Sequence, residues 1–520
     1  MNKFKQKLSA YFRGRNFTSL VLVSIVICAV VFLNMILYML TSAFGWYLYS
    51  PEELDLSITD SSDALFADAE SGMEVTVTFC MFESELKEHS TGSFVYKTAL
   101  QFAERYPDLI KLKYANIYTR VYDDLERTPF NPDAYAKGTY PDGTEYDNII
   151  LPTSVIFECK QTDGASVVWQ DYKVVTDAYT SVGFGSFSTL ASDGSSITET
   201  SYNGEEVFAS MVHWVMTKEH GTAYVTVGHG EIADPSLSSA LTSAGYYVKY
   251  LDLKEEDVPT DAELVVISNP RHDFERGASG TDTELERLES YRNRGGSFYV
   301  TLDPLADKLV NLEGFLSGYG LSVEYNEADG ERALVKDTVS GIPGDGFTLI
   351  ASYAKDGTAA DMKAKSESDG GGVLLRALSP ITVDKSKGAE ALLYSSSAAV
   401  LHRAGATVDT AGSYPLAAIS TYENRDGSES KLFLSAGIYL TSSDNMITEG
   451  YSNKSFLYSL FDVFFEKGNM PYGCRSVVYE NTLLENLTMG TATAFTAAML
   501  AIPVLLAAVG TVVLVRRRNR

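Results

Sequence analysis

Cysteine is scarce in this chain, with four residues among 520. Cys28 lies inside an apolar run, which leaves Cys80, Cys159 and Cys474 for the rest of the chain and permits at most one disulfide among them. No cysteines are paired at the spacing of zinc ligands. The sequence therefore excludes a disulfide-rich scaffold and a cysteine-based zinc centre.

Two catalytic motifs are also missing. The chain contains no Gly-Lys dipeptide and hence no phosphate-binding P-loop, so any ATP hydrolysis belongs to another protein. No Gly-x-Ser-x-Gly follows a strand of the second α/β segment, and no cysteine lies between Cys159 and Cys474, so a nucleophile elbow is absent as well. We predict no catalytic residue and no cofactor.

Basic residues are outnumbered, with 42 Lys and Arg against 68 Asp and Glu, and the formal net charge is −26. Such a surface repels nucleic acid and anionic lipid. Because the acidic residues are spread along the whole chain, we interpret the charge as solvation of the surface.

Long apolar runs stand near both ends, at residues 17–40 and 492–515. Each is uncharged and long enough to cross a bilayer as a helix, and each adjoins a basic tail, 1–16 or 516–520. These runs predict a two-span protein of the bacterial plasma membrane, with both termini cytoplasmic and residues 41–491 extracytoplasmic. The first run is too long for an ordinary cleaved secretory signal, and no Leu-Pro-x-Thr-Gly precedes the second.

The first α/β segment is expected at 53–182. The spacing predicts a strand at 73–82, a helix at 93–105, a strand at 109–118 and a hairpin at 151–170. This order resembles a thioredoxin-like domain, in which a Pro-Thr step such as Pro152-Thr153 leads into the hairpin. No second cysteine stands two residues after Cys80, so we predict that the domain is redox-inactive.

A Ser, Thr and Gly rich segment at 183–204 predicts a linker, and a second α/β domain is expected at 205–470, with an insertion around 322–430. Strands alternate there with helices, which predicts a parallel sheet of the flavodoxin or amidotransferase type covered on both faces. The expected strands are 223–227, 247–251, 264–268, 297–302, 415–422 and 431–436, and the expected helices are 205–216, 236–244, 281–294, 304–318 and 453–465.

Polar side chains follow three of these strands. Because ligands bind beyond the carboxyl ends of strands in open α/β sheets, we predict that the rim of a ligand-binding pocket is formed by His229, Glu231, Asn269, Asp273 and Asp303.

Two interpretations of these residues remain open. If His229, Glu231, Asp273 and Asp303 converge, they could hold a divalent metal ion. Alternatively, Gly228 and Gly230 permit a tight turn while the carboxylates favour helix starts, and we prefer this interpretation.

The order of motifs resembles a known family, the auxiliary components of bacterial ABC-type transport systems associated with gliding motility. The resemblance rests on Asn203-Gly204-Glu205-Glu206, Val227-Gly228-His229-Gly230-Glu231, Gly245-Tyr246, Leu251-Asp252-Leu253, Val258-Pro259, Asn269-Pro270, Gly295-Gly296 and Asp303-Pro304. It implies an accessory protein that works beside a separately encoded ABC ATPase and a multi-span permease. It also implies that the second segment is similar to an amidotransferase fold without the catalytic cysteine.

The expected function is a non-catalytic auxiliary membrane subunit of such a transport system, whose outer region binds a ligand, an envelope component or the permease. The alternative is a metal-dependent hydrolase of cell-envelope material, and a third hypothesis is a purely structural anchor.

Overall fold

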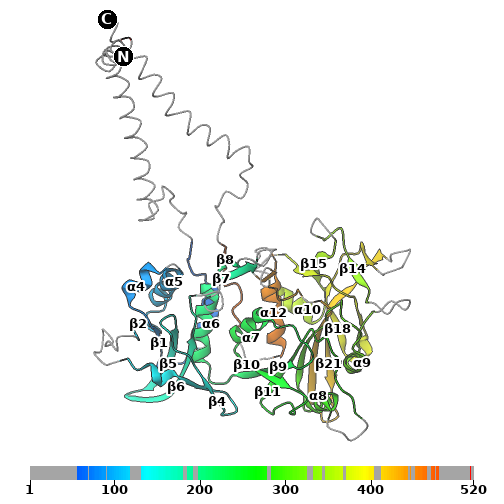
Figure 1. Cartoon of the computed structure of the whole chain (residues 1–520), viewed down its shortest axis with the longest axis horizontal. Helices are drawn as coiled ribbons and strands as arrows, with labels where there is room; N and C mark the ends of the chain where they lie inside the picture. The colour runs from blue at the N-terminus through cyan, green and yellow to red at the C-terminus, as the bar shows by residue number, and fades with distance from the viewer. Residues whose placement is uncertain are drawn as a thin grey trace, which may run out of the picture. The chain divides into compact units, whose positions relative to one another are not determined.

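The computed structural model describes residue 516 and residues 55–478, apart from 68, 90, 118–129, 180–183, 185, 191–196, 278–282, 325–331, 342–345, 367–370, 403–410, 438, 443–444, 447–450, 465–469 and 475. The described residues form a mixed α/β fold built around two main sheets (Figure 1).

The first sheet has the strand order β2-β1-β5-β6. Its strands are β1 (Met73–Phe79), β2 (Ile110–Tyr114), β5 (Val155–Asp163) and β6 (Ser166–Val175). β1 and β2 are parallel and are connected through α5 (Gly92–Arg105), whereas β5 and β6 form an antiparallel hairpin. The predicted strand-helix-strand unit and hairpin are confirmed, and the thioredoxin-like assignment stays a prediction.

The helix α6 (Gly204–Met216) packs on this first sheet, although we had placed it in the second domain. It contacts β1, β5 and β6. Phe208 stacks on Phe102 with ring centroids 4.6 Å apart and meets Phe157 edge-on at 5.3 Å. An apolar helix face predicts burial but does not tell against which sheet, and the domain boundary at residue 205 stays a prediction.

The segment expected as a linker at 183–204 contains two strands. β7 (Ser186–Leu190) and β8 (Ile197–Tyr202) pair as an antiparallel hairpin, and β23 (Val477–Val478) adds to β8. Other short elements of the first half are α3 (Ser61–Phe66), α4 (Glu83–Glu88), a 3-10 turn at Pro132–Tyr135, β3 (Lys137–Thr139) and β4 (Glu145–Asp147).

The second sheet has nine strands in the order β10-β9-β11-β12-β22-β21-β18-β15-β16. They are β9 (Gly221–Val227), β10 (Tyr246–Asp252), β11 (Ala262–Ser268), β12 (Ser297–Thr301), β15 (Thr348–Tyr353), β16 (Val373–Arg376), β18 (Ala389–Tyr394), β21 (Pro415–Glu423) and β22 (Glu429–Ser435).

Only part of this sheet is parallel, which corrects the prediction of a parallel-sheet domain. The strands from β10 to β22 are parallel, and those from β21 to β16 are antiparallel. Much of the expected insertion at 322–430 therefore belongs to the sheet itself. Its strands are short and interrupted by glycines, so their period was not visible in the sequence.

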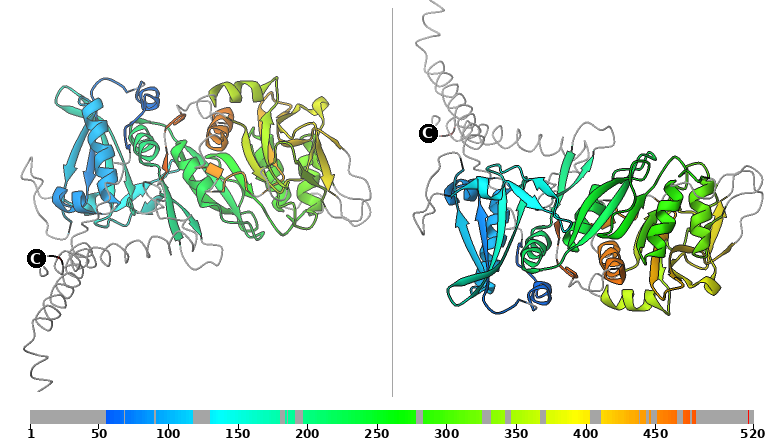
Figure 2. Two further views of the ribbon diagram at one scale, coloured as in Figure 1. Left: turned by 90° about the horizontal axis from the view of Figure 1, so that it is seen from above. Right: turned by 90° about the horizontal axis from the view of Figure 1, so that it is seen from below.

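Helices cover both faces of the large sheet, as predicted. α7 (Pro235–Ser243), α10 (Thr358–Lys365) and α12 (Asn453–Phe464) pack on one face, where Tyr299 stacks on Phe433. α8 (Glu284–Asn293) and α9 (Val310–Gly318) pack on the other face around Phe298, and Figure 2 shows α10 and α12 opposite α8 and α9.

Two small sheets flank this domain. One pairs β13 (Leu321–Val323) with β17 (Ile381–Val383), and the other is formed by β14 (Leu334–Lys336), β19 (Ala399–His402) and β20 (Ala411–Gly412). A 3-10 turn at Lys385–Lys387 precedes β18.

The predicted membrane spans at 17–40 and 492–515, with their basic tails, lie outside the described residues. None of the helices in the described part of the chain combines the length and the apolar character that crossing a bilayer demands. The longest of them, α5, has 14 residues and extends about 21 Å, against about 30 Å of hydrocarbon.

On this finding, the prediction of a two-span plasma-membrane protein with cytoplasmic termini and residues 41–491 extracytoplasmic is corrected. The fold class is mixed α/β, and the membrane assignment is not carried further.

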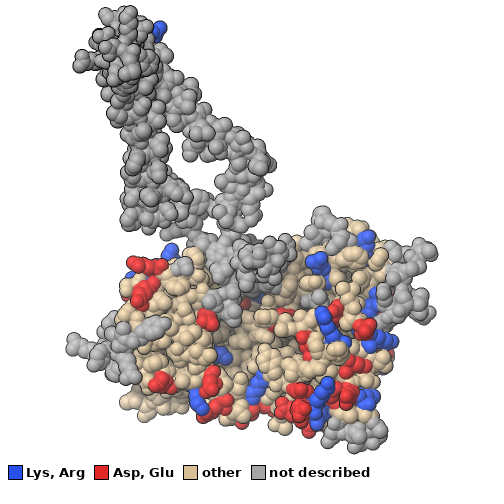
Figure 3. All heavy atoms as spheres, viewed as in Figure 1, with Lys and Arg blue, Asp and Glu red and all other residues tan. Residues whose placement is uncertain are grey.

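Acidic and basic side chains are interspersed over the described surface that Figure 3 shows. On this face the negative charge of the chain is not gathered into a single patch.

Candidate functional site

The polar loop that follows β9 turns sharply at two glycines. Gly228 and Gly230 have φ angles of 104° and 71°, a region that strains residues with a side chain. The conformation of the loop therefore requires glycine at both positions, at the carboxyl end of β9.

His229 lies beneath this loop rather than on a pocket rim. Its side chain is 1% exposed and its ring stacks on Phe274, with centroids 3.8 Å apart. Nδ1 lies 3.2 Å from Glu231 Oε1 and Nε2 lies 2.9 Å from Glu284 Oε1. The His229 amide donates to Glu231 Oε2 at 2.7 Å. Both ring nitrogens are thus engaged by carboxylates.

The pKa shifts agree with a charged cluster. Burial disfavours protonation of His229, but its hydrogen bonds with Glu231 and Glu284 outweigh that effect and raise its pKa. Burial works against ionisation of Glu231, yet the hydrogen bond with His229 and the backbone hydrogen bonds lower its pKa. A histidine whose protonated form is favoured by two carboxylates is poorly suited to act as a general base.

Glu284 was not predicted as part of this site. It lies at the start of α8, 55 residues after His229, and its other oxygen accepts from the Glu275 amide at 2.6 Å. Its only sequence signal is an acidic residue in the first turn of a helix, which many helices share.

Two of the other predicted rim residues close local turns. Asp273 accepts from the amides of Asn311 and Leu312 at 2.8 and 3.1 Å, and so caps the start of α9. Asp303 Oδ1 accepts from the Leu305 amide at 2.9 Å. Asp303 was expected to cap the helix that follows it, but it closes a turn, and Asp273 caps α9 instead.

Asn269 is different, because it is buried in a left-handed conformation with φ of 50°. Its amide donates to the Thr301 carbonyl at 2.9 Å, and its Oδ1 has no hydrogen-bond partner among the described residues. The predicted metal ligands His229, Glu231, Asp273 and Asp303 are engaged in these separate contacts. Within the described ranges, no group of three or more His, Cys, Asp and Glu residues is arranged to hold a metal ion.

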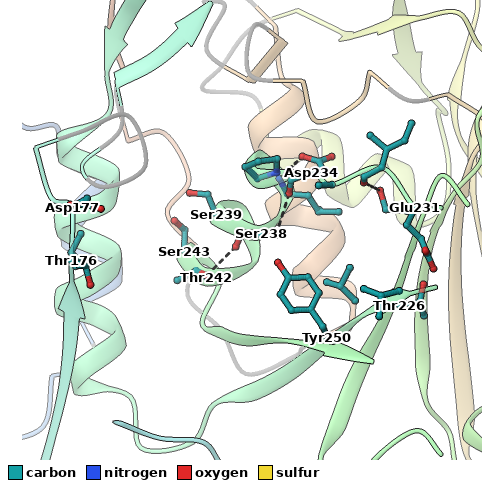
Figure 4. Close-up of a pocket in the computed structure, with 18 of the residues that line it drawn as sticks. Thr176, Asp177, Thr226, Glu231, Asp234, Ser238, Ser239, Thr242, Ser243 and Tyr250 are labelled. Atoms are coloured by element: carbon teal, nitrogen blue, oxygen red, sulfur yellow. Dashed lines mark hydrogen bonds between the residues drawn. The ribbon is translucent and has the colours of Figure 1, made fainter. Parts of the chain in front are cut away.

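A cavity of about 760 Å³ lies beside the loop, between β6 and α6 on one side and β9, β10 and α7 on the other (Figure 4). Of the predicted rim residues, Glu231 belongs to its lining, whereas His229, Asn269, Asp273 and Asp303 do not. The described lining residues are Lys173–Asp177, Val207, Met211, Val225–Gly228, Gly230–Pro235, Leu237–Ser239, Thr242, Ser243, Tyr250 and Ser268.

The cap of α7 stands in the cavity wall. Asp234 Oδ1 accepts from the Leu237 amide at 2.9 Å and its other oxygen accepts from Thr441. Pro235 follows at the first helical position, so the sequence Asp-Pro explains the helix start. The carboxylate that caps this helix is thus Asp234, three residues after Glu231.

Much of the lining is hydroxyl-bearing, and one such group stands out. The Thr226 Oγ1 atom is buried and has no hydrogen-bond partner among the described residues. Tyr250, by contrast, is 69% exposed, and Figure 4 shows its ring projecting among the lining residues of α7. The sequence did not single out Tyr250, because alternation in a strand does not distinguish a solvent-facing tyrosine from a cavity wall.

Lys173 in the lining, and Asp171 and His220 outside it, are ionisable groups that burial pushes toward their neutral forms. The Lys173 ammonium lies 4.0 Å from the ring centroid of Trp214 and 4.9 Å from that of Tyr247. Burial lowers the pKa of Lys173 to about 8 and raises the pKa of Asp171 to about 6. His220, stacked on Trp214 at 4.3 Å, has its pKa lowered by burial to about 4.

The three buried thiols do not form a redox centre in the described residues. Cys80, Cys159 and Cys474 are free, and burial raises the pKa of Cys80 and Cys159 to about 12. Thiolates are the reactive species, so these cysteines are inert at neutral pH.

No protein-family model and no curated protein matches the chain. Among solved structures it is similar to the mmIFT52 N-terminal domain (17% identity, 48% of this chain, 99% of that chain, TM-score 0.35). It is also similar to a putative ThuA-like protein from Bacteroides uniformis (13%, 48% and 94%, TM-score 0.29) and to PurLQS from Thermotoga maritima (12%, 47% and 100%, TM-score 0.26). Because these TM-scores lie below 0.5, the likenesses assign neither a family nor an activity to the chain.

Proposed function

We propose that this chain is a non-catalytic auxiliary component of a bacterial ABC-type transport system, whose α/β region binds a ligand or partner in the cavity beside α7. The observation that carries the proposal is the contrast at the carboxyl edge of β9. The ionisable groups there are consumed in internal contacts, while a 760 Å³ cavity stands open next to them.

A binding role fits the dimensions of the cavity, since ligand pockets measure about 300–1,000 Å³. The link to a transport system rests on the motif resemblance, from Asn203 to Pro304, and on the absence of a P-loop. Energy would then come from a separately encoded ATPase, and translocation from a separately encoded multi-span permease.

The test is affinity purification of the tagged full-length chain from its native cells after mild crosslinking, with quantitative mass spectrometry against an untagged strain. We expect one ABC ATPase and one permease to be enriched together, in constant ratio. If neither protein is enriched, the transport assignment is overturned.

The metal-dependent hydrolase remains the alternative, and no contact in the described residues favours it. Its discriminating measurement is calorimetric titration of the protein with Zn²⁺, Mn²⁺ and Ca²⁺. Tight stoichiometric binding that is lost in His229→Gln would revive it.

A further inference from the structure

The edge of β6 forms one wall of the cavity. The last three residues of the strand, Lys173–Val175, belong to its lining, and so do Thr176 and Asp177 of the turn that follows. Side chains alternate between the two faces of a strand, so consecutive residues can line one cavity only where the strand presents its edge. β6 pairs with β5 on its other side, and no described strand pairs with this edge.

The edge offers backbone hydrogen-bonding groups. The Tyr172 amide donates to the Asp171 side chain at 2.8 Å instead of to β5. Because amide direction alternates with a period of two, the amide and carbonyl of Val174 point away from β5 as well. Unpaired groups on a strand edge are a template for a further strand.

The charge of the lining residues indicates which charge a bound strand should carry. Asp177 and Asp234 contribute carboxylates, whereas the carboxylate of Glu231 is engaged by His229, and Lys173 is the one cation among the described lining residues. Its ammonium is directed to the rings of Trp214 and Tyr247. The wall therefore favours a positively charged occupant.

Two further groups face the space beside this edge. The exposed ring of Tyr250 offers a surface for an alkyl chain or a guanidinium. The buried Thr226 hydroxyl, a lining group without a partner among the described residues, offers a hydrogen bond.

We propose that the cavity receives an extended, basic segment of a partner protein, which adds to the free edge of β6 as a further strand. Main-chain hydrogen bonds to Val174 hold the segment, and alternate Lys or Arg side chains reach Asp177, Asp234 and Tyr250. This inference rests on the proposed binding function and names its partner class.

The probe is a library of blocked heptapeptides with Lys or Arg at every second position, titrated against the full chain by fluorescence anisotropy. The tightest peptide is then compared with two analogues, one with Glu in place of each basic residue and one with alternate amides N-methylated. We expect each analogue to bind at least tenfold more weakly, since the first reverses the charge and the second removes the edge hydrogen bonds.

Two variants test the assigned edge. Val174→Pro removes the outward amide, which edge strands tolerate, and should weaken peptide binding at least tenfold, whereas Val174→Thr should retain it. Val175→Pro, whose amide faces β5, should instead destabilise the fold. If Val174→Pro itself unfolds, the N-methylated peptide decides the question on the unmodified protein.

Failure of every basic peptide to bind, or full affinity of the N-methylated analogue, overturns the inference. Enrichment of the ATPase and permease without peptide binding would sink this inference and leave the transport function standing. Peptide binding without enrichment of the ATPase and permease would support this inference and overturn the transport function.

Discussion

The cluster around His229 and the cavity wall around Lys173 handle buried charge in opposite ways. In the first, an imidazole lies between Glu231 and Glu284, and its hydrogen bonds raise its pKa despite burial. In the second, burial lowers the pKa of Lys173 to about 8 and that of His220 to about 4. One region keeps its charges by pairing them, and the other moves toward neutral forms.

This difference distinguishes residues that stabilise the fold from residues that are available to a ligand at the edge of the large sheet. A compensated cluster has no capacity left for a ligand and stabilises a turn. A wall with an unpaired strand edge, an unpartnered hydroxyl and an exposed tyrosine retains that capacity. The Gly-His-Gly-Glu motif therefore has a structural role, and the residues beside it form the binding surface that we propose.

The largest effect should come from breaking the compensated cluster with Glu284→Ala. Removing Glu284 leaves the buried Nε2 of His229 without a partner, although Glu231 still holds Nδ1. An unsatisfied buried group costs about 1–3 kcal/mol, and more when it is charged, so we expect a loss of about 3 kcal/mol in the free energy of unfolding. Urea denaturation followed by circular dichroism measures it. The matched control is Glu289→Ala on the same helix, whose ion pair with Arg276 is solvent-exposed and should contribute less than about 1 kcal/mol. Equal effects of the two substitutions would contradict the comparison.

An intermediate effect is expected from acidification, through His220, which stacks on Trp214 next to Lys173. The pKa of His220 is lowered to about 4. Between pH 7 and 5, His220 therefore becomes protonated in the unfolded chain but stays largely neutral in the folded chain. Stability contributed by this residue is present at pH 7 and is lost as the pH falls below the unfolded value of about 6.5, by about 2 kcal/mol at pH 5.

The variant His220→Phe keeps a ring on Trp214 and removes the titration. Wild type should therefore lose about 2 kcal/mol more than His220→Phe between pH 7 and pH 5, measured by urea denaturation at both values. His229, whose pKa is raised, acts with the opposite sign, since its contribution is present below about pH 6.5 and is lost as the pH rises through its folded pKa. Identical pH profiles of the two proteins would show that the His220 ring is not desolvated.

The smallest effect on stability should come from Tyr250→Ala. Its side chain is 69% exposed, and exposed substitutions change stability by about 0.5 kcal/mol or less. The same substitution should weaken binding of the basic peptide, whereas Leu305→Ala, exposed by 77% and outside the lining, should change neither quantity. A large stability loss in Tyr250→Ala would place this ring in the core instead of the binding surface.

Elements with a strong period were predictable. The strand at 73–82, the helix at 93–105, the alternating strands and helices from 221 to 318, and the last helix are present within a few residues. The prediction failed where it had to say which helix or strand packs on which sheet. The helix at 204–216 packs on the first sheet, and the strands between 348 and 394 extend the second one, because an apolar pattern specifies burial without naming the partner.

The candidate site shows the same limit at the level of single residues. His229 and Glu231 were recognisable from Gly-His-Gly-Glu, but their partner Glu284 lies 55 residues away from His229 and carries no signal of its own. Asp273 and Asp303 follow strands as predicted, yet they turn toward nearby backbone amides and do not converge. Lys173 and Tyr250 come from edge strands of different sheets, and no local pattern relates them.

By itself, the sequence determined which strongly periodic segments form strands and helices, where glycines permit tight turns, and that neither a P-loop nor a paired redox cysteine is present. These properties depend on residues within a few positions of one another. Only the tertiary structure decided that the histidine is enclosed, that the cavity lies beside it, and that an unpaired strand edge forms the wall. Those properties depend on which distant surfaces exclude water together, and that is set when whole elements pack.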